Sequence, residues 1–236
     1  MKNNYDFSSI QLYYLEYLFS IEFEIEIGID AIKTILNKQY LIIEQSKSML
    51  IESIKKDEYL KSIEEEHKGD YINQFYQREE FVIKEIIMHQ MYSLCLTIYS
   101  FIEGRLKFIC EYLEKNNSYK IKIEDLSTND DLMKFWNYLT KVFEINPALA
   151  EKYLTPLKQQ KIVRNIIAHQ DGKPTIEQLR RITRIKGLEI VNYGNFHQIV
   201  INENDYIYFL LDKTELFFKE LLKSIDLRHK EIADKK

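Results

Sequence analysis

The sequence predicts a mostly all-α fold: an antiparallel bundle of long helices with a small β-hairpin near the C-terminus. Glycine (6) and proline (3) are scarce among the 236 residues, which favours long helices over a turn-rich β fold. Apolar residues recur at helical spacing through most of the chain. Only residues 188–201 alternate around a Gly194-Asn195 turn signal, which is the pattern of a hairpin.

The chain is expected to form one domain over residues 1–236. Its composition, 45% hydrophobic and 30% charged, is ordinary for a soluble globular protein. No internal repeat or low-complexity linker divides it. Within the domain we expect a helical N-terminal extension at 1–69 and a core at 70–232 that includes the hairpin.

Several features indicate a cytoplasmic protein with no membrane association. The N-terminus lacks the apolar core of a signal peptide, and no uninterrupted apolar run approaches a membrane span. Cys95 and Cys110 lie about 22 Å apart on one predicted helix, too far for a disulfide, so free thiols are expected. The net charge of −4 gives no global basic field, although a local basic surface could still recruit nucleic acid.

The first helical segment begins in the apolar, aromatic residues 6–20, where Asp6 or Ser8 could cap it. Residues 21–29 alternate strictly between apolar and other residues, a pattern that alone favours a strand. Helix-forming residues on both sides, and the lack of a partner strand nearby, favour helix instead. The segment continues to about Lys68, and Gly69-Asp70 is the predicted break.

A second long helix is expected over 71–115, and its centre is the most apolar part of the chain, so it should lie deep in the core or in a core plus a subunit interface. A helix near 129–143 contains the only tryptophan, Trp136. A short basic helix follows at 175–186, then the hairpin, then an amphipathic helix over about 205–231.

One polar helix face stands out between these elements, over residues 161–169. Thr155 is expected to cap this helix with Pro156 at its first position, and Gly172 and Pro174 are expected to stop it. Its apolar residues fill one arc. The opposite arc carries Lys161, Arg164, Asn165, Ala168 and His169. The simplest interpretation is a solvated helix end, with His169 favoured by the helix dipole and Arg164 extended into water.

Other catalytic patterns are missing from the sequence. The five histidines are scattered, and there is no HExxH or CxxC motif, so no metal is expected. Glu64-Glu65-Glu66 is interpreted as a helix end or turn. There is no P-loop, no GxGxxG and no GxSxG motif, so no nucleotide cofactor and no serine hydrolase site is predicted.

RNA cleavage, by contrast, can use the residues on the polar face without a metal. A histidine can take the proton of a ribose 2′-hydroxyl, and an arginine can neutralise charge on the phosphate. Arg164 and His169 are separated by about 140° around the helix axis, so one helix does not aim both at one phosphate. Two such helices about a two-fold axis would place two Arg/His pairs across a shared cleft.

The spacing Arg164-Asn165, three residues, His169 resembles the R-(polar)-x3–5-H signature of HEPN domains, helical bundles common in prokaryotic toxin–antitoxin and phage-defence systems. The apolar helix with Ser100-Phe-Ile-Glu103-Gly-Arg-Leu106 is similar to the family's earlier core helix, which often bears an acidic residue near the motif. The Gly/Pro break, the hairpin and the closing aromatic helix are also similar. The resemblance covers about residues 70–230.

The resemblance implies a homodimeric, metal-independent endoribonuclease that cleaves RNA by internal 2′-hydroxyl attack, with an antitoxin or another defence-system protein as a possible partner. His169 would be the general base or acid and Arg164 would stabilise the phosphate. Asn165 would orient His169 or a phosphate oxygen, and Glu103 would hold Arg164 or His169 in place. Arg180, Arg181 and Arg184 would follow the RNA backbone.

Each of these assignments has a plainer alternative. Glu103 can be an ordinary helix carboxylate, and the three arginines a solvated helix face. The whole chain can be a non-catalytic helical module that binds a partner protein or RNA. It can also be a structural subunit of a larger complex, which the acidic net charge favours.

Overall fold

The computed structural model describes residues 13–117, 119–128, 130–201 and 203–235, and it confirms the predicted fold class of long helices with a small hairpin near the C-terminus. The predicted caps Asp6 and Ser8 lie outside the described residues. The elements are α1 (Glu16–Lys56), α2 (Glu58–Ser62), α3 (Glu65–Asn116), the 3-10 turn η2 (Ile123–Asp125), α4 (Asp131–Asn137), the π-helical turn η3 (Tyr138–Val142), α5 (Glu151–Gln170), α6 (Ile176–Ile182), β1 (Leu188–Asn192), β2 (His197–Ile201) and α7 (Glu203–Ala233).

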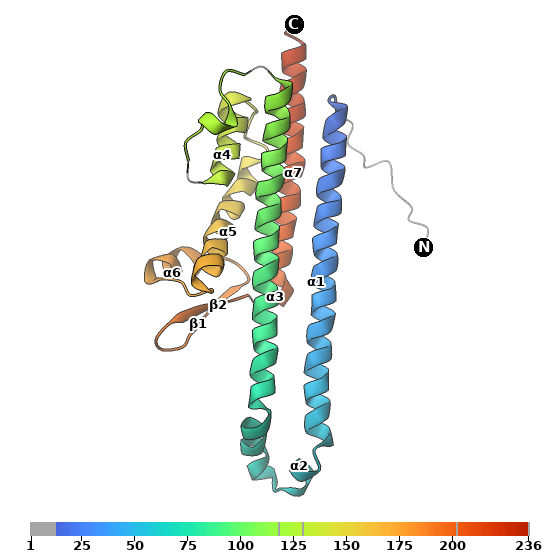
Figure 1. The fold of residues 1–236 in the computed structure, drawn as a ribbon, viewed down its shortest axis with the longest axis vertical. Helices are drawn as coiled ribbons and strands as arrows, with labels where there is room; N and C mark the ends of the chain where they lie inside the picture. The colour runs from blue at the N-terminus through green and yellow to red at the C-terminus, as the bar shows by residue number, and fades with distance from the viewer. Residues whose placement is uncertain (1–12, 118, 129, 202, 236) are drawn as a thin grey trace, which may run out of the picture.

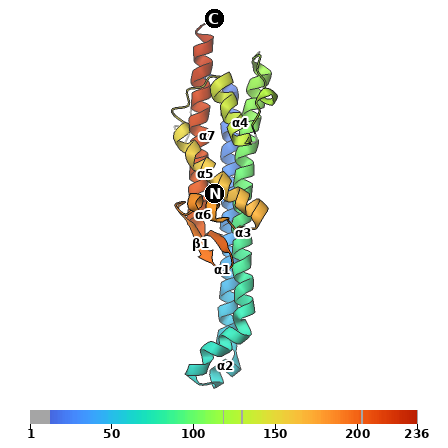
Figure 2. The same cartoon turned by 90° about the vertical axis from the view of Figure 1, so that its left-hand side faces the viewer.

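The long helices lie side by side along the longest axis of the molecule (Figure 1). α1 runs in one direction and α3 returns beside it, with α2 at the tip where they join. α7 runs parallel to α3, and α5 runs opposite to both. Figure 2 shows that α4, α5, α6 and the hairpin lie alongside the upper and middle parts of the long helices. The part of α1 and α3 nearest α2 therefore projects as a two-helix stalk.

The alternating segment 21–29 is helical, as predicted. Ile21, Ile25 and Ile29 are buried because a spacing of four places them on one face of α1. Phe23 and Ile27, which complete the strand-like alternation, are about half exposed on the other side (54% and 53%). The helical neighbours on both sides thus decide the conformation, and the apolar residues between the buried positions remain on the surface.

The predicted break at Gly69-Asp70 is wrong, because both residues lie inside α3. The chain turns earlier, at Asp57. Its carboxylate accepts the Leu60 N–H at 3.0 Å and so caps α2, and it also accepts the hydroxyls of Tyr71 and Tyr76 at 3.2 and 2.7 Å. A glycine inside a helix costs only about 1 kcal/mol, so the rest of α3 outweighs that cost.

The predicted start of the motif helix at Thr155 and Pro156 is also wrong. α5 begins at Glu151, and Pro156 lies inside it. The Pro147 carbonyl accepts the N–H groups of Ala150 and Glu151 at 3.1 and 2.9 Å, which starts the helix a turn earlier. Pro156 removes only one backbone hydrogen bond near the helix start, and the helix continues past it.

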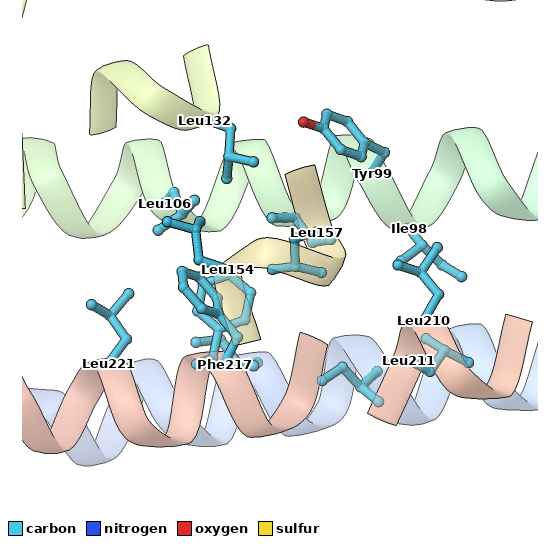
Figure 3. Close-up of a cluster of buried hydrophobic side chains, with 14 of the residues drawn as sticks. Ile98, Tyr99, Leu106, Leu132, Leu154, Leu157, Leu210, Leu211, Phe217 and Leu221 are labelled. Atoms are coloured by element: carbon cyan, nitrogen blue, oxygen red, sulfur yellow. The ribbon is translucent and has the colours of Figure 1, made fainter. Parts of the chain in front are cut away.

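A continuous apolar core fills the space between α1, α3, α5 and α7. Figure 3 shows side chains from α3, α5 and α7 meeting, and the labelled ones include Ile98, Leu106, Leu154, Leu157, Leu210, Phe217 and Leu221, all almost fully buried. The buried residues of α1 belong to the same core. The predicted division into an N-terminal extension (1–69) and a core (70–232) is a separate matter from the helix break, and it stays a prediction.

α3 is long and apolar enough to cross a membrane by length and composition alone, since its best stretch of 18 residues has a mean hydropathy of 1.2. A single helix of this kind among the described residues is a weak indication of a span. The core helices of soluble proteins pass the same test, and α3 contributes eleven of the buried core residues.

The hairpin has the predicted position, with β1 antiparallel to β2 and Leu188 opposite Ile201. β2 is fastened to the chain that follows α5. The Ile199 N–H donates to the Gly172 carbonyl at 2.9 Å, and the Tyr92 hydroxyl of α3 donates to the Ile199 carbonyl at 2.6 Å. Gly172 has a left-handed φ of 72°, and a Cβ there would lie 1.9 Å from the Tyr92 hydroxyl oxygen.

Gly172→Ala should therefore destabilise the fold by more than backbone strain alone. We expect a loss of about 2 kcal/mol or more in the free energy of unfolding, measured with denaturant, because strain and overpacking add. Gly194→Ala is the matched control: its φ is 84°, but a Cβ would meet nothing within 4 Å. It should cost only about 1–2 kcal/mol. Equal losses in the two variants would contradict the close approach at Gly172.

Candidate functional site

The candidate site is built on the outer face of α5. Val163 and Ile166 are fully buried and Ile167 nearly so, which fixes the rotation of this helix against the core. Arg164 and Asn165 are half-buried, while His169 is exposed in the last turn. The predicted separation of an apolar and a polar arc is therefore present in the structure.

Arg164 packs against α3. Its guanidinium carbon lies 5.6 Å from the centre of the Tyr99 ring, and its Nη1 donates to Asn165 Oδ1 at 2.9 Å. Figure 3 shows Tyr99 projecting from α3 on the side away from α7. The Arg164 Nε is buried and has no hydrogen-bond partner among the described residues. Arg164 is thus held in place, and one N–H of its guanidinium lacks a hydrogen-bond acceptor among the described residues.

Three residues on one face of α3, Cys95, Tyr99 and Glu103, experience the charge of Arg164. Burial raises the pKa of the Glu103 carboxyl, while Arg164 acts in the opposite direction. Burial likewise raises the pKa of the Cys95 thiol to about 12, although Arg164 lowers it, so this thiol stays protonated at neutral pH. Cys95, Tyr99 and Glu103 follow one another at intervals of four residues. They therefore lie on one face of α3, the face that α5 covers.

His169 is not brought to Arg164 within one chain. Its imidazole has no hydrogen bond or ion pair with any described residue. From Arg164 it is separated by about 7.5 Å along the axis and about 140° around it. The helix ends just beyond it, where Asp171 is left-handed with a φ of 52°. The structure therefore groups Arg164, Asn165 and Glu103, and leaves His169 free to meet a substrate or a second chain.

The three predicted RNA-binding arginines are divided by the fold. Arg181 lines a groove of about 530 Å³ with Asn165, Lys158 and Lys161. Lys161 pairs with Asp130 at 2.6 Å, whereas Lys158 and Arg181 are exposed. The groove is therefore basic and opens beside the motif. Arg180 and Arg184 are exposed but do not line it.

Gln160 is a residue that the sequence analysis did not single out. It lies one turn before Arg164, is 1% exposed, and neither side-chain polar atom has a hydrogen-bond partner among the described residues. Buried amides are usually hydrogen-bonded, so this one is unusual. The sequence did contain a signal for Gln160, because this amide lies within the same apolar arc of the helix as Val163 and Ile167.

One group of residues has the spacing of a metal site among those that the structure describes. The ligand atoms of Glu64, Glu66 and His67 lie within 4.8 Å of one another, and all three side chains are exposed near the stalk tip. Exposed acidic groups commonly gather without an ion. This group is far along α3 from Glu103 and has no part in the candidate site.

Comparison of the chain with models of known protein families, with curated proteins and with solved structures finds no match in any of the three.

The electrostatic effect of Arg164 on Glu103 can be tested by titration. Replacement Arg164→Met removes a positive charge that lowers the Glu103 pKa, so that pKa should rise further above its ordinary value. It can be followed by NMR through the side-chain carboxyl carbon of Glu103. Lys161→Met, which removes a weaker influence of the same sign, should produce a smaller rise. A Glu103 pKa that falls or does not move in Arg164→Met would show that the two groups are not neighbours in solution.

Proposed function

We propose that this chain is a metal-independent endoribonuclease of the HEPN type, a cytoplasmic toxin or phage-defence effector that acts as a homodimer. The observation that carries the proposal is the state of Arg164: a guanidinium aligned by Tyr99 and Asn165, influenced by Glu103, and left with an unsatisfied buried N–H. A preorganised cation of this kind is suited to a phosphate in a transition state.

In this mechanism His169 accepts the proton from a ribose 2′-hydroxyl. The resulting 2′-oxygen attacks the adjacent phosphorus, and the bond to the 5′-oxygen of the next nucleotide breaks. The leaving oxygen takes a proton, and the products are a 2′,3′-cyclic phosphate and a 5′-hydroxyl. Arg164 neutralises the charge that develops on the phosphate, with Asn165 as its positioning residue. The groove beside Asn165, with Lys158 and Arg181, would hold the phosphates that flank the cleaved bond.

A dimer is required because Arg164 and His169 diverge on one helix. α3 offers a face for it beside the motif, a stripe of small, exposed residues: Ser93, Thr97, Ser100 and Gly104. Ala168 of α5 is also small and exposed. Small side chains let the backbones of two chains approach closely, and a two-fold axis on this face would bring His169 of one copy toward Arg164 of the other.

The alternative is a non-catalytic helical module that binds RNA or a partner protein. The observation in its favour is the same divergence, because no single chain contains an assembled pair. The basic groove would then be the principal site, and binding would depend on salt and on Lys158 and Arg181 without any cleavage. An antitoxin or defence-system partner fits either proposal.

Purified protein should cleave single-stranded RNA in the presence of EDTA and leave cyclic-phosphate ends. His169→Ala should reduce the cleavage rate by about 100-fold or more, since a positioned general base contributes that much. His67→Ala, an equal change at the stalk tip, is the matched control and should cleave normally. Cleavage that survives in His169→Ala at the wild-type rate would overturn the assignment. Salt-sensitive RNA binding without cleavage in the wild type would favour the module.

Ser100→Arg should convert the dimer into a monomer and abolish cleavage even though Arg164 and His169 are unchanged. Two arginines brought together on a two-fold axis repel each other and occupy the space that a serine leaves open. Ser48→Arg, on an exposed part of α1, should leave both properties intact. Mass is measured by light scattering and activity by the EDTA assay. A monomeric wild type with full activity, or an active dimer of Ser100→Arg, would rule out this interface.

A further inference from the structure

A second hollow lies away from the motif, between α1, α3 and the hairpin. Its volume is about 410 Å³, within the range of about 300–1,000 Å³ typical of small-molecule sites. Its wall is apolar and includes Ile43, Ile87, Met88, Met91, Val200 and Ile201. Methionines adapt their shape to the molecule they contact, which suits a flexible or aromatic ligand.

The rim of this groove carries side chains of both charges. Lys47 of α1 and Lys84 of α3 both line it, against one acidic residue, Glu85. Lys47 pairs with Glu44 at 3.1 Å and Lys84 with Glu80 at 2.6 Å. An ammonium group has three N–H donors, so each lysine keeps donors for another anion. The groove therefore fits a molecule with an apolar body and one anionic group.

Gln198 connects the groove to the end of α5. It lines the groove and is 6% exposed, and its Nε2 lies 2.8 Å from the Tyr92 hydroxyl, 2.8 Å from the Asp171 carbonyl and 3.7 Å from Met88 Sδ. An amide nitrogen carries two hydrogens, so it cannot donate to all three at once. A ligand that contacts Met88 would change which two of these acceptors receive a hydrogen bond from Gln198. Asp171 is two residues from His169.

We propose that this groove binds a small monoanionic amphiphile and that its occupancy is communicated through Gln198 to the turn that follows His169. By thermodynamic linkage, a substrate or partner that stabilises one conformation of the turn after His169 also changes the affinity of the groove for its ligand. Neither statement depends on RNA cleavage, so a failure of the ribonuclease proposal would leave both standing.

Two fluorescent probes test the ligand chemistry: anilinonaphthalene sulfonate and phenylnaphthylamine, which share the same rings but differ in the anionic group. The full chain should bind the sulfonate, and Lys47→Met/Lys84→Met should weaken it about tenfold while the neutral probe is unaffected. Lys120→Met, exposed in the loop that follows α3, is the control and should change neither.

Val200→Trp should fill the groove and displace both probes, while the circular dichroism spectrum stays that of the folded chain. The lysine variants change one exposed residue and one half-buried residue, neither of them in the core, so they keep the test valid if the tryptophan variant does not fold. Sulfonate binding that is equal in the wild type and in the double lysine variant would overturn the ligand class. Binding of both probes that survives Val200→Trp would overturn the site.

Hydrogen exchange tests the communication. Binding of the sulfonate probe should change protection of the Gly172 and Ile199 amides, which hydrogen-bond to Ile166 and Gly172 respectively, and leave the Phe143 amide unchanged. In Gln198→Leu the probe should still bind without that change. Unaltered protection of both amides in the wild type with probe bound would disprove the communication.

Discussion

The apolar surface of α3 is the constraint on which the rest of the molecule depends. The part between Met91 and Leu113 is buried at so many positions around its axis that no single neighbour can cover it. α1, α5, α7 and β2 each cover one part. This requirement explains why segments far apart in the sequence converge on one helix.

The same packing determines where chemistry can occur. α5 crosses the one sector of α3 that carries Tyr99 and Glu103, so Arg164 enters a half-buried environment where its charge is screened less than in water. His169 follows after the last buried turn and stays in solvent. The apolar arc of α5 determines how this helix is rotated about its axis. That one rotation places the Arg164 guanidinium against α3 and the His169 imidazole in solvent.

The fold class, the hairpin and the helical state of 21–29 could be predicted because the spacing of apolar residues can be read from the sequence alone. In the folded chain the same residues form the buried faces. Two helix boundaries could not be predicted, although the ends of α3 and α5 were predicted within about two residues. Gly69 does not break α3 because Asp57 offers the chain a better turn through side-chain hydrogen bonds with Tyr71 and Tyr76, which no local pattern reveals. Pro156 does not begin α5 for a similar reason, since Pro147 supplies earlier backbone acceptors.

For the candidate site, the motif spacing identified the polar face, but the neighbours of Arg164 depend on which stripe of α3 it meets. Glu103 was named from the resemblance and lies within the influence of Arg164, whereas the role of Tyr99 as the surface beneath the guanidinium and the buried amide of Gln160 needed three-dimensional packing. The separation of Arg181 from Arg180 and Arg184 has the same origin. Arg180 and Arg181 are neighbours on α6 and point about 100° apart, and Arg184 follows the end of that helix.

The close approach of Tyr92 to Gly172 also limits how this protein can change over evolutionary time. The phenol oxygen of Tyr92 occupies the volume in which any side chain at position 172 would begin. A substitution at either position therefore alters the fitness of substitutions at the other. In related sequences the two positions should vary together, with a larger residue at 172 appearing only where the aromatic residue at 92 has been replaced by a smaller one.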